Sequence, residues 1–124
     1  MIRTYEQENT FFIQPGFHLL EDQQEALSKV LEAALQKKPY YLVVDCRNLE
    51  QICIPALRLL VAMLQKTEAQ QIAFGFIGFQ EKVMQLLEVT GIRNLLTIAD
   101  TERALRLKLQ NARNSPLAKN GVLP

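Results

Sequence analysis

Residues 43–60 read VVDCRNLEQICIPALRLL, and this stretch decides the fold. It contains an apolar run that ends at an acid, then a polar bend, then the start of a leucine-rich helix. Pro55 suits the first turn of that helix, because its missing N–H would have no partner there. In open α/β sheets, ligands and partners usually dock at such a junction, at the carboxyl end of a strand. Here the junction reads Cys53-Ile54-Pro55-Ala56 and offers no hydroxyl, imidazole or carboxylate.

The rest of the chain alternates strand and helix patterns. The run YYLVVD shows no polar alternation, as expected of a strand that is covered on both faces. Gly91 is placed to end a helix in the left-handed conformation. Gly75 and Gly78 lack the further residues of a phosphate loop, so we expect them to allow close approach between helix and strand. Strands are expected at 2–6, 9–14, 40–45, 72–78 and 95–99, and helices at 21–37, from 55 onward, at 83–90 and at 101–112.

This order of elements predicts an α/β fold. We expect a mixed, mostly parallel sheet of five strands packed with four helices, because right-handed crossovers join the later strands. The first strand is expected to lie antiparallel at an edge of the sheet. The length of 124 residues suits one domain with a substantial core, which we place at 1–112. Residues 113–124 contain proline, glycine and polar residues, and we expect a flexible C-terminal tail.

Composition excludes several classes of protein. The net charge is +1, so no overall field draws the chain toward nucleic acid. No apolar run approaches the roughly 18 residues of a membrane span, and the N-terminus lacks a signal pattern. Two cysteines and one histidine are too few for a zinc site of ordinary spacing. We therefore expect a cytoplasmic protein without cofactor, metal, nucleic acid or membrane insertion.

Three stretches together resemble the STAS domain, the family of sulfate transporter domains and anti-sigma factor antagonists. They are VVDCRNLEQICIPALRLLVAML, IAFGFIG and VMQLLEVTGIRNLLTIADTERAL. The resemblance implies the STAS, or SpoIIAA-like, fold, and a non-enzymatic binding module in bacterial signal transduction and transcription regulation. In the family, an antagonist binds a kinase-type anti-sigma factor through the bend and the following helix. Phosphorylation of a serine in an Asp-Ser-Ser-Gly motif breaks that contact.

The family motif can be carried over position by position. Asp45 matches the acid that ends the family's strand. Cys53 stands at the motif's Asp, Ile54 at its first Ser, Pro55 at the phosphorylated Ser and Ala56 at the Gly. Three of the four motif residues are therefore replaced by apolar ones and the fourth by a thiol. No Ser, Thr or Tyr occurs at 42–66, so the resemblance predicts that the phosphoserine switch is absent.

The expected function is thus a regulatory module that binds a protein and is not switched by phosphorylation at this site. The expected partners are an anti-sigma factor or kinase-like regulator, or other STAS proteins, and an apolar corner also favours a homodimer. The alternative is a ligand-sensing or accessory subunit of an anion or lipid transport system. The expected partner-binding residues are Arg47, Asn48, Gln51, Cys53, Ile54, Pro55, Ala56, Arg58 and Leu59.

Several single residues have both a structural and a functional interpretation. Cys53 is either a packing residue or a thiol activated near a helix N-terminus, and a thiol-dependent enzyme would require the second. Asp45 either accepts backbone hydrogen bonds in the turn or takes part in chemistry, and the resemblance favours the turn. Arg47 and Arg58 are either solvated charges or the grip on an acidic partner. His18 stands without other metal ligands nearby, so we expect a structural or surface role.

Overall fold

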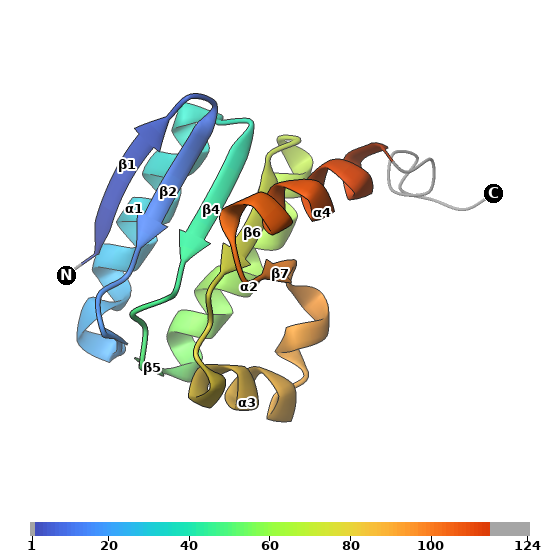
Figure 1. Cartoon of the computed structure of the whole chain (residues 1–124). Coiled ribbons are helices and arrows are strands. Elements are labelled where there is room, and N and C mark those ends of the chain that lie inside the picture. The colour runs from blue at the N-terminus through green and yellow to red at the C-terminus, as the bar shows by residue number, and fades with distance from the viewer. Residues whose placement is uncertain (1, 115–124) are drawn as a thin grey trace.

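Figure 1 shows the computed structural model of the chain, which describes residues 2–114, with side chains up to residue 111. The elements, in chain order, are β1 (Arg3–Gln7), β2 (Thr10–Gln14), β3 (His18–Leu19), the 3-10 helix η1 (Glu21–Gln23), α1 (Gln24–Lys37), β4 (Tyr41–Asp45), β5 (Gln51–Ile52), α2 (Ile54–Ala69), β6 (Ala73–Ile77), α3 (Glu81–Val89), the 3-10 helix η2 (Ile92–Leu95), β7 (Ile98–Ala99) and α4 (Glu102–Asn114).

Five strands form one mixed sheet in the order β1-β2-β4-β6-β7. β1 runs antiparallel to β2, and the other neighbours are parallel. In the middle of the sheet, Val44 of β4 lies between Ile13 of β2 and Phe76 of β6. The predicted sheet, with its antiparallel first strand at an edge, is confirmed. Because the inner strands are parallel, the loops that follow them gather at one end of the sheet.

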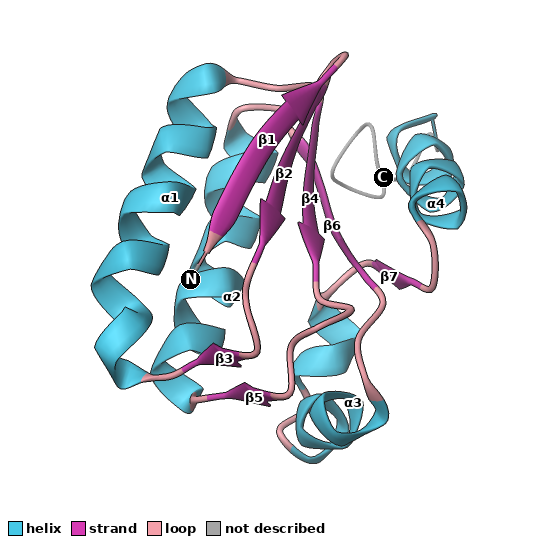
Figure 2. Ribbon diagram, turned by 60° about the vertical axis from the view of Figure 1, so that its left-hand side comes forward, coloured by secondary structure: helices cyan, strands magenta, loops and turns pink. Residues whose placement is uncertain are grey.

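The helices form two unequal layers. Figure 2 shows α1 and α2 on one side of the sheet and α4 on the other, with α3 near the end where the loops gather. The larger core, which includes Leu31 and Leu57, lies against α1 and α2. The smaller core, which includes Val43 and Leu105, lies under α4. All five residues of β4 and of β6 are buried, so the expectation of strands covered on both faces is confirmed.

Arg106 fixes α4 to the sheet. Its Nη2 donates a hydrogen bond to the buried Thr10 hydroxyl at 2.7 Å, and its guanidinium lies 4.8 Å from the centroid of the Tyr41 ring. The same guanidinium pairs with Glu102 one turn earlier. These contacts hold the helix over β2 and β4.

Gly75, Gly78 and Gly91 are each required for a different structural reason. A Cβ on Gly75 would lie 2.5 Å from Leu105 Cδ1, so the predicted close approach of helix and strand is confirmed there. Gly91 has φ +77° and follows α3, as predicted. Gly78 also has a positive φ, +73°, but a side chain there would overlap Arg47 rather than a helix. This contact is part of the corner described below.

One small sheet was not predicted. β3 and β5 pair in parallel, with His18 opposite Gln51 and Leu19 opposite Ile52. Strands of two residues are too short to show any periodicity in the sequence. This ribbon ties the start of α1 to the bend that precedes α2.

The C-terminal part of the prediction is corrected in two places. The strand expected at 95–99 shortens to β7, because η2 occupies the residues that follow Gly91. α4 continues to Asn114, two residues beyond the helix end predicted at 112, and residues 115–124 of the predicted tail lie outside the described residues. Among the helices of residues 2–114, none has both the length and the apolar character needed to cross a bilayer.

Candidate partner-binding corner

The bend between β4 and α2 is held by backbone hydrogen bonds to two neighbouring strands. Cys46 donates its N–H to the carbonyl of Ile77 in β6 at 2.8 Å, and Cys53 donates to the carbonyl of Leu19 in β3 at 2.9 Å. Between them, the side chain of Leu49 is completely buried. The bend is therefore a fixed part of the fold that presents the residues around it in one arrangement.

Asp45 ends β4 and is only 5% exposed, yet its carboxylate meets four donor groups. One oxygen accepts the Arg47 N–H at 3.1 Å and Nε at 2.9 Å. The other accepts Arg47 Nη2 at 2.6 Å and Gln14 Nε2 at 3.1 Å. Burial alone would raise the pKa of Asp45, but these hydrogen bonds and the arginine charge outweigh burial and hold the pKa below its usual value. Asp45 thus has the turn role expected from the sequence.

Arg47 is fixed although its side chain is 64% exposed. Asp45 holds its guanidinium, and the bare Cα of Gly78 leaves space for its stem. From the loop after β6, Gln80 Nε2 donates to the Arg47 carbonyl at 2.9 Å. The two loops at the carboxyl ends of β4 and β6 therefore form one surface around Arg47.

The start of α2 follows the sequence prediction. Cys53 is the N-cap residue with extended backbone (φ −88°, ψ 160°), and Pro55 lies in the first turn. The Cys53 side chain makes no capping hydrogen bond, and the first turn contains no acidic residue. The helix N-terminus at the corner thus lacks the acidic side chain that often lies at this position.

The predicted partner-binding residues differ in exposure. Arg47, Asn48, Gln51, Ile54 and Arg58 are exposed, whereas Cys53, Pro55 and Leu59 are half-buried. Ala56 is a correction, because its side chain is 1% exposed and packs in the larger core. The Ala56 side chain is therefore not part of the exposed surface of the corner. The other eight residues lie on the bend and the first two turns of α2.

Phe17 is a surface residue of this corner that the sequence reasoning missed. Its side chain is 61% exposed, and its carbonyl accepts the N–H groups of Glu50 at 2.8 Å and Gln51 at 3.2 Å. Ile54, also at the corner, is 40% exposed. The pairing of β3 with β5 holds together the two segments that carry these exposed apolar side chains, and exposed apolar patches mark interaction sites. The only available signal in the sequence was an aromatic residue directly after the Pro-Gly turn, outside any strand pattern.

The surroundings of the two cysteines support a packing role for each thiol and not a reactive one. Burial, together with the charge of Asp45, raises the pKa of the Cys46 thiol well above its usual value. Cys53 is half-buried and packs against the larger core. Among residues 2–114, no base is hydrogen-bonded to its sulfur. The arrangement that would activate a nucleophilic thiol is not found in this part of the chain.

Comparison with known proteins identifies the family. The family model described as STAS domain matches residues 1–105. The chain belongs to the STAS domain family. The match includes all the strands, the bend and the first three α-helices. No curated protein matches the sequence closely enough to be counted as a relative.

Solved structures share the fold of this STAS domain at low sequence identity. An anti-sigma factor antagonist from Mycobacterium paratuberculosis superposes with a TM-score of 0.78 at 15% identity, covering 89% of this chain and 93% of that chain. The Bacillus protein SpoIIAA, in its unphosphorylated form, gives a TM-score of 0.72 at 12% identity and covers 100% of both chains. The murine anion transporter Slc26a9 gives 0.67 at 9% identity, covering 86% of this chain and 18% of the transporter.

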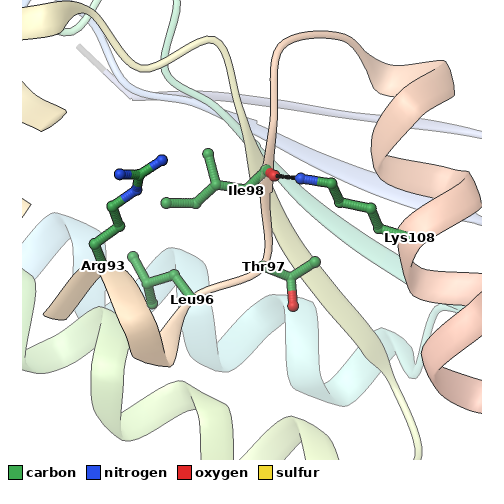
Figure 3. A pocket seen from close by; sticks show the side chains of 5 residues that line it. All are labelled: Arg93, Leu96, Thr97, Ile98 and Lys108. Carbon is green, nitrogen blue, oxygen red and sulfur yellow. Dashed lines mark hydrogen bonds between the residues drawn. The ribbon is translucent and has the colours of Figure 1, made fainter.

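This STAS domain also has an open cavity of about 310 Å³ at the β7 edge of its sheet (Figure 3). The cavity is lined by Arg93, Leu96, Thr97, Ile98 and Lys108. Lys108 Nζ donates to the Ile98 carbonyl, and Arg93 pairs with Glu88 at 2.7 Å. None of the lining residues belongs to the bend, so this cavity is separate from the corner.

Proposed function

We propose that this STAS domain is a cytoplasmic, non-enzymatic regulatory module that binds a protein partner through the corner. The corner consists of the exposed and half-buried residues of the bend and of the first turns of α2, together with Phe17. The single observation that carries the proposal is the composition of the corner, which contains the exposed apolar residues Phe17 and Ile54 and the anchored cation Arg47. Apolar anchors with a polar surround are typical of protein interfaces.

The partner class follows from the family. An anti-sigma factor or kinase-like regulator, or another STAS protein, is the partner that similarity to anti-sigma factor antagonists supports. Arg47 suits an acidic group on such a partner, because a guanidinium that is already positioned loses less freedom on binding. The apolar part of the corner would supply most of the affinity, since buried apolar anchors dominate interface energies.

We further propose that kinases cannot switch this contact at the usual position. SpoIIAA has been solved in both unphosphorylated and phosphorylated forms, so that relative carries the modification. Here Pro55 stands at the aligned position, and the chain from 42 to 66 has no hydroxyl side chain. The roughly two negative charges that a phosphate would bring into the interface therefore have no site. The contact is expected to persist when a partner kinase is active.

Capture of bound proteins from the native cytosol tests the corner. Ile54→Asp and Phe17→Asp each place a charge at an apolar anchor, so each is expected to remove the specific partner. Leu107→Asp is the matched control, because Leu107 is 55% exposed on α4, on the other side of the sheet. If both corner variants capture the same proteins as the unmodified chain, the proposed surface is wrong.

A second experiment tests the missing switch. Incubation with ATP and the captured kinase is expected to leave residues 45–60 without phosphate, as read by peptide mass spectrometry. Pro55→Ser restores a hydroxyl at the aligned position, and its phosphorylation is expected to release the partner. A Pro55→Ser variant that is phosphorylated at residue 55 and still holds the partner would overturn the proposal.

The transport-system alternative has one observation in its favour. Two cationic side chains, Arg93 and Lys108, line the cavity at the β7 edge, and part of an anion transporter has the same fold. Titration with sodium sulfate, followed by NMR of backbone amides, tests it. Shifts confined to the cavity and abolished by Arg93→Gln would favour an anion-sensing role, and unchanged spectra would remove it.

A further inference from the structure

β1 is a free edge of the sheet. Among residues 2–114 it is last in the strand order and pairs only with β2, and all five of its residues are exposed. Figure 1 shows no described element beyond it. Its pairing is continuous from Arg3 opposite Gln14 to Gln7 opposite Thr10, without a bulge, and it contains no proline or lysine. Natural proteins usually protect such an edge, and β1 carries only the two charges of Arg3 and Glu6 for this purpose, so its backbone is available for pairing with another strand.

The backbone groups that face outward on β1 can be identified. The Asn9 carbonyl accepts an N–H from the first residue of β4 at 3.0 Å, so the backbone groups of Asn9 face β4. The backbone N–H and C=O groups of successive residues point to alternate sides of a strand. Those of Thr10 therefore face β1, where Thr10 pairs with Gln7. Continuing the alternation along β1, the N–H and C=O of Thr4 and Glu6 point away from β2. These groups have the spacing of a β-ladder.

We propose that two copies of this chain pair through β1 as antiparallel strands related by a two-fold axis, which joins their sheets into one. The register that pairs all five residues places Tyr5 opposite Tyr5 of the second copy. Thr4 then lies opposite Glu6 of the second copy, and the two exchange both backbone hydrogen bonds; symmetry repeats this pair. Arg3 lies opposite Gln7 of the second copy.

The side chains of β1 suit a second copy as the occupant. Tyr5 stacks on Phe12 of β2, with ring centroids 4.6 Å apart and planes at 12°. At the two-fold axis the Tyr5 rings of both copies form a non-hydrogen-bonded pair, where opposite side chains are closest, and they extend this row of rings. No like charges lie directly opposite each other in this register, and the charge of Glu6, which is diagonal to its symmetry copy, is already paired with Lys37 at 3.3 Å.

The proposed dimer is weak and does not depend on the proposed function of the corner. Five residue pairs make a small interface, so the dimer is expected to form in a concentration-dependent way. β1 is separated from β4 by β2, and Ile54 and Phe17, the residues substituted at the corner, are not part of β1. Failure of the corner experiments would leave this pairing untouched, and the reverse also holds.

Sedimentation equilibrium over a wide range of protein concentrations tests the pairing and its register. Gln7→Arg places like charges opposite Arg3 twice in the symmetric interface, so the dimer dissociation constant is expected to rise roughly three- to tenfold. Gln7→Glu places opposite charges there, and the constant is expected to fall by a similar factor. Gln85→Arg makes the same chemical change on the exposed face of α3 and is expected to have no effect.

A double variant with reversed charges distinguishes charge repulsion in the dimer from a loss of folding caused by the substitutions. Arg3→Glu combined with Gln7→Arg restores opposite charges across the axis and is expected to return the dissociation constant toward that of the unmodified chain. A chain that stays monomeric at every concentration would overturn the proposal. So would a dimer whose dissociation constant does not respond to either change at Gln7.

Discussion

The negative charge of Asp45 helps to hold the side chains of Arg47 and Gln14 in place at the corner. Its pKa is lowered because Arg47 and Gln14 donate to the carboxylate strongly enough to outweigh its burial. A group whose folded pKa is lowered contributes stability above its unfolded pKa, and this contribution is lost as the pH falls through the folded pKa. The stability that Asp45 contributes at the corner should therefore decrease as the pH falls below about 4.

Asp45→Asn measures this contribution. The variant is expected to lose about 1 to 3 kcal/mol of unfolding free energy near neutral pH, because it replaces charge-assisted hydrogen bonds by weaker ones. Urea unfolding at about pH 7 and about pH 3 should show the difference from the unmodified chain shrinking in acid. Asp100→Asn removes an exposed carboxylate and should change stability by less than about 0.5 kcal/mol. An equal loss at both pH values would show that the charge of Asp45 is not the cause.

Gly78 and Gly91 form a natural comparison of backbone strain with crowding. Both have positive φ, at +73° and +77°, so alanine at either is expected to cost about 1 kcal/mol from backbone strain alone. An added Cβ meets nothing within 4 Å at Gly91 but overlaps the Arg47 stem at Gly78. Gly78→Ala should therefore be clearly more destabilising than Gly91→Ala in thermal unfolding. Equal losses would mean that Arg47 moves aside at no cost.

At the scale of elements, the sequence was most informative where a pattern repeats. The uniformly apolar runs of β4 and β6 and the Leu-rich start of α2 were predicted, because burial on both faces and a proline in the first turn have clear signatures. At the start of α4, the Thr101 hydroxyl accepts the Ala104 N–H at 3.2 Å. Two-residue strands such as β3 and β5 could not be predicted, because their pairing depends on where distant segments meet.

The candidate site was predictable only in part for the same reason. The resemblance placed the bend, Pro55 and Arg47, because these follow one another along the chain. Phe17 is 30 residues before Arg47 in the numbering and reaches the corner only through hydrogen bonds from Glu50 and Gln51. The burial of Ala56 likewise depends on how closely α2 packs on the sheet, which a local motif does not determine.

α1 offers a prediction at the scale of an element. Lys38 ends this helix in the left-handed conformation, with φ 49°, and donates its N–H to the Leu35 carbonyl at 3.2 Å. Glycine adopts this conformation without a Cβ penalty, so Lys38→Gly should raise the unfolding free energy by about 0.5 to 1 kcal/mol. Gln36→Gly, at an exposed position inside the helix, should lower it by about as much. Chemical denaturation of both variants checks the opposite signs, and destabilisation by both would contradict the capping argument.

At the scale of the whole molecule, the two helix layers determine which surfaces stay open. α1 and α2 cover one face of the sheet, whereas α4 alone lies on the other and is anchored over β2 and β4. One helix cannot cover a five-stranded face, and Tyr5 of β1 covers part of Phe12, which also packs in the core under α4. The same arrangement leaves the β1 edge free and the corner after β4 exposed, which gives the domain two separate surfaces.

These two surfaces should act independently. Substitutions that share no partners usually have additive effects, and the corner and the β1 edge have no residue in common. Ile54→Asp is therefore expected to abolish partner capture while it leaves the dimer dissociation constant unchanged, and Gln7→Arg should do the reverse. The double variant should show both losses, each within experimental error of its single variant, by capture and by sedimentation equilibrium. If Ile54→Asp also shifted the dimer constant, the self-association would involve the corner, and the two copies would compete with the protein partner instead of binding beside it.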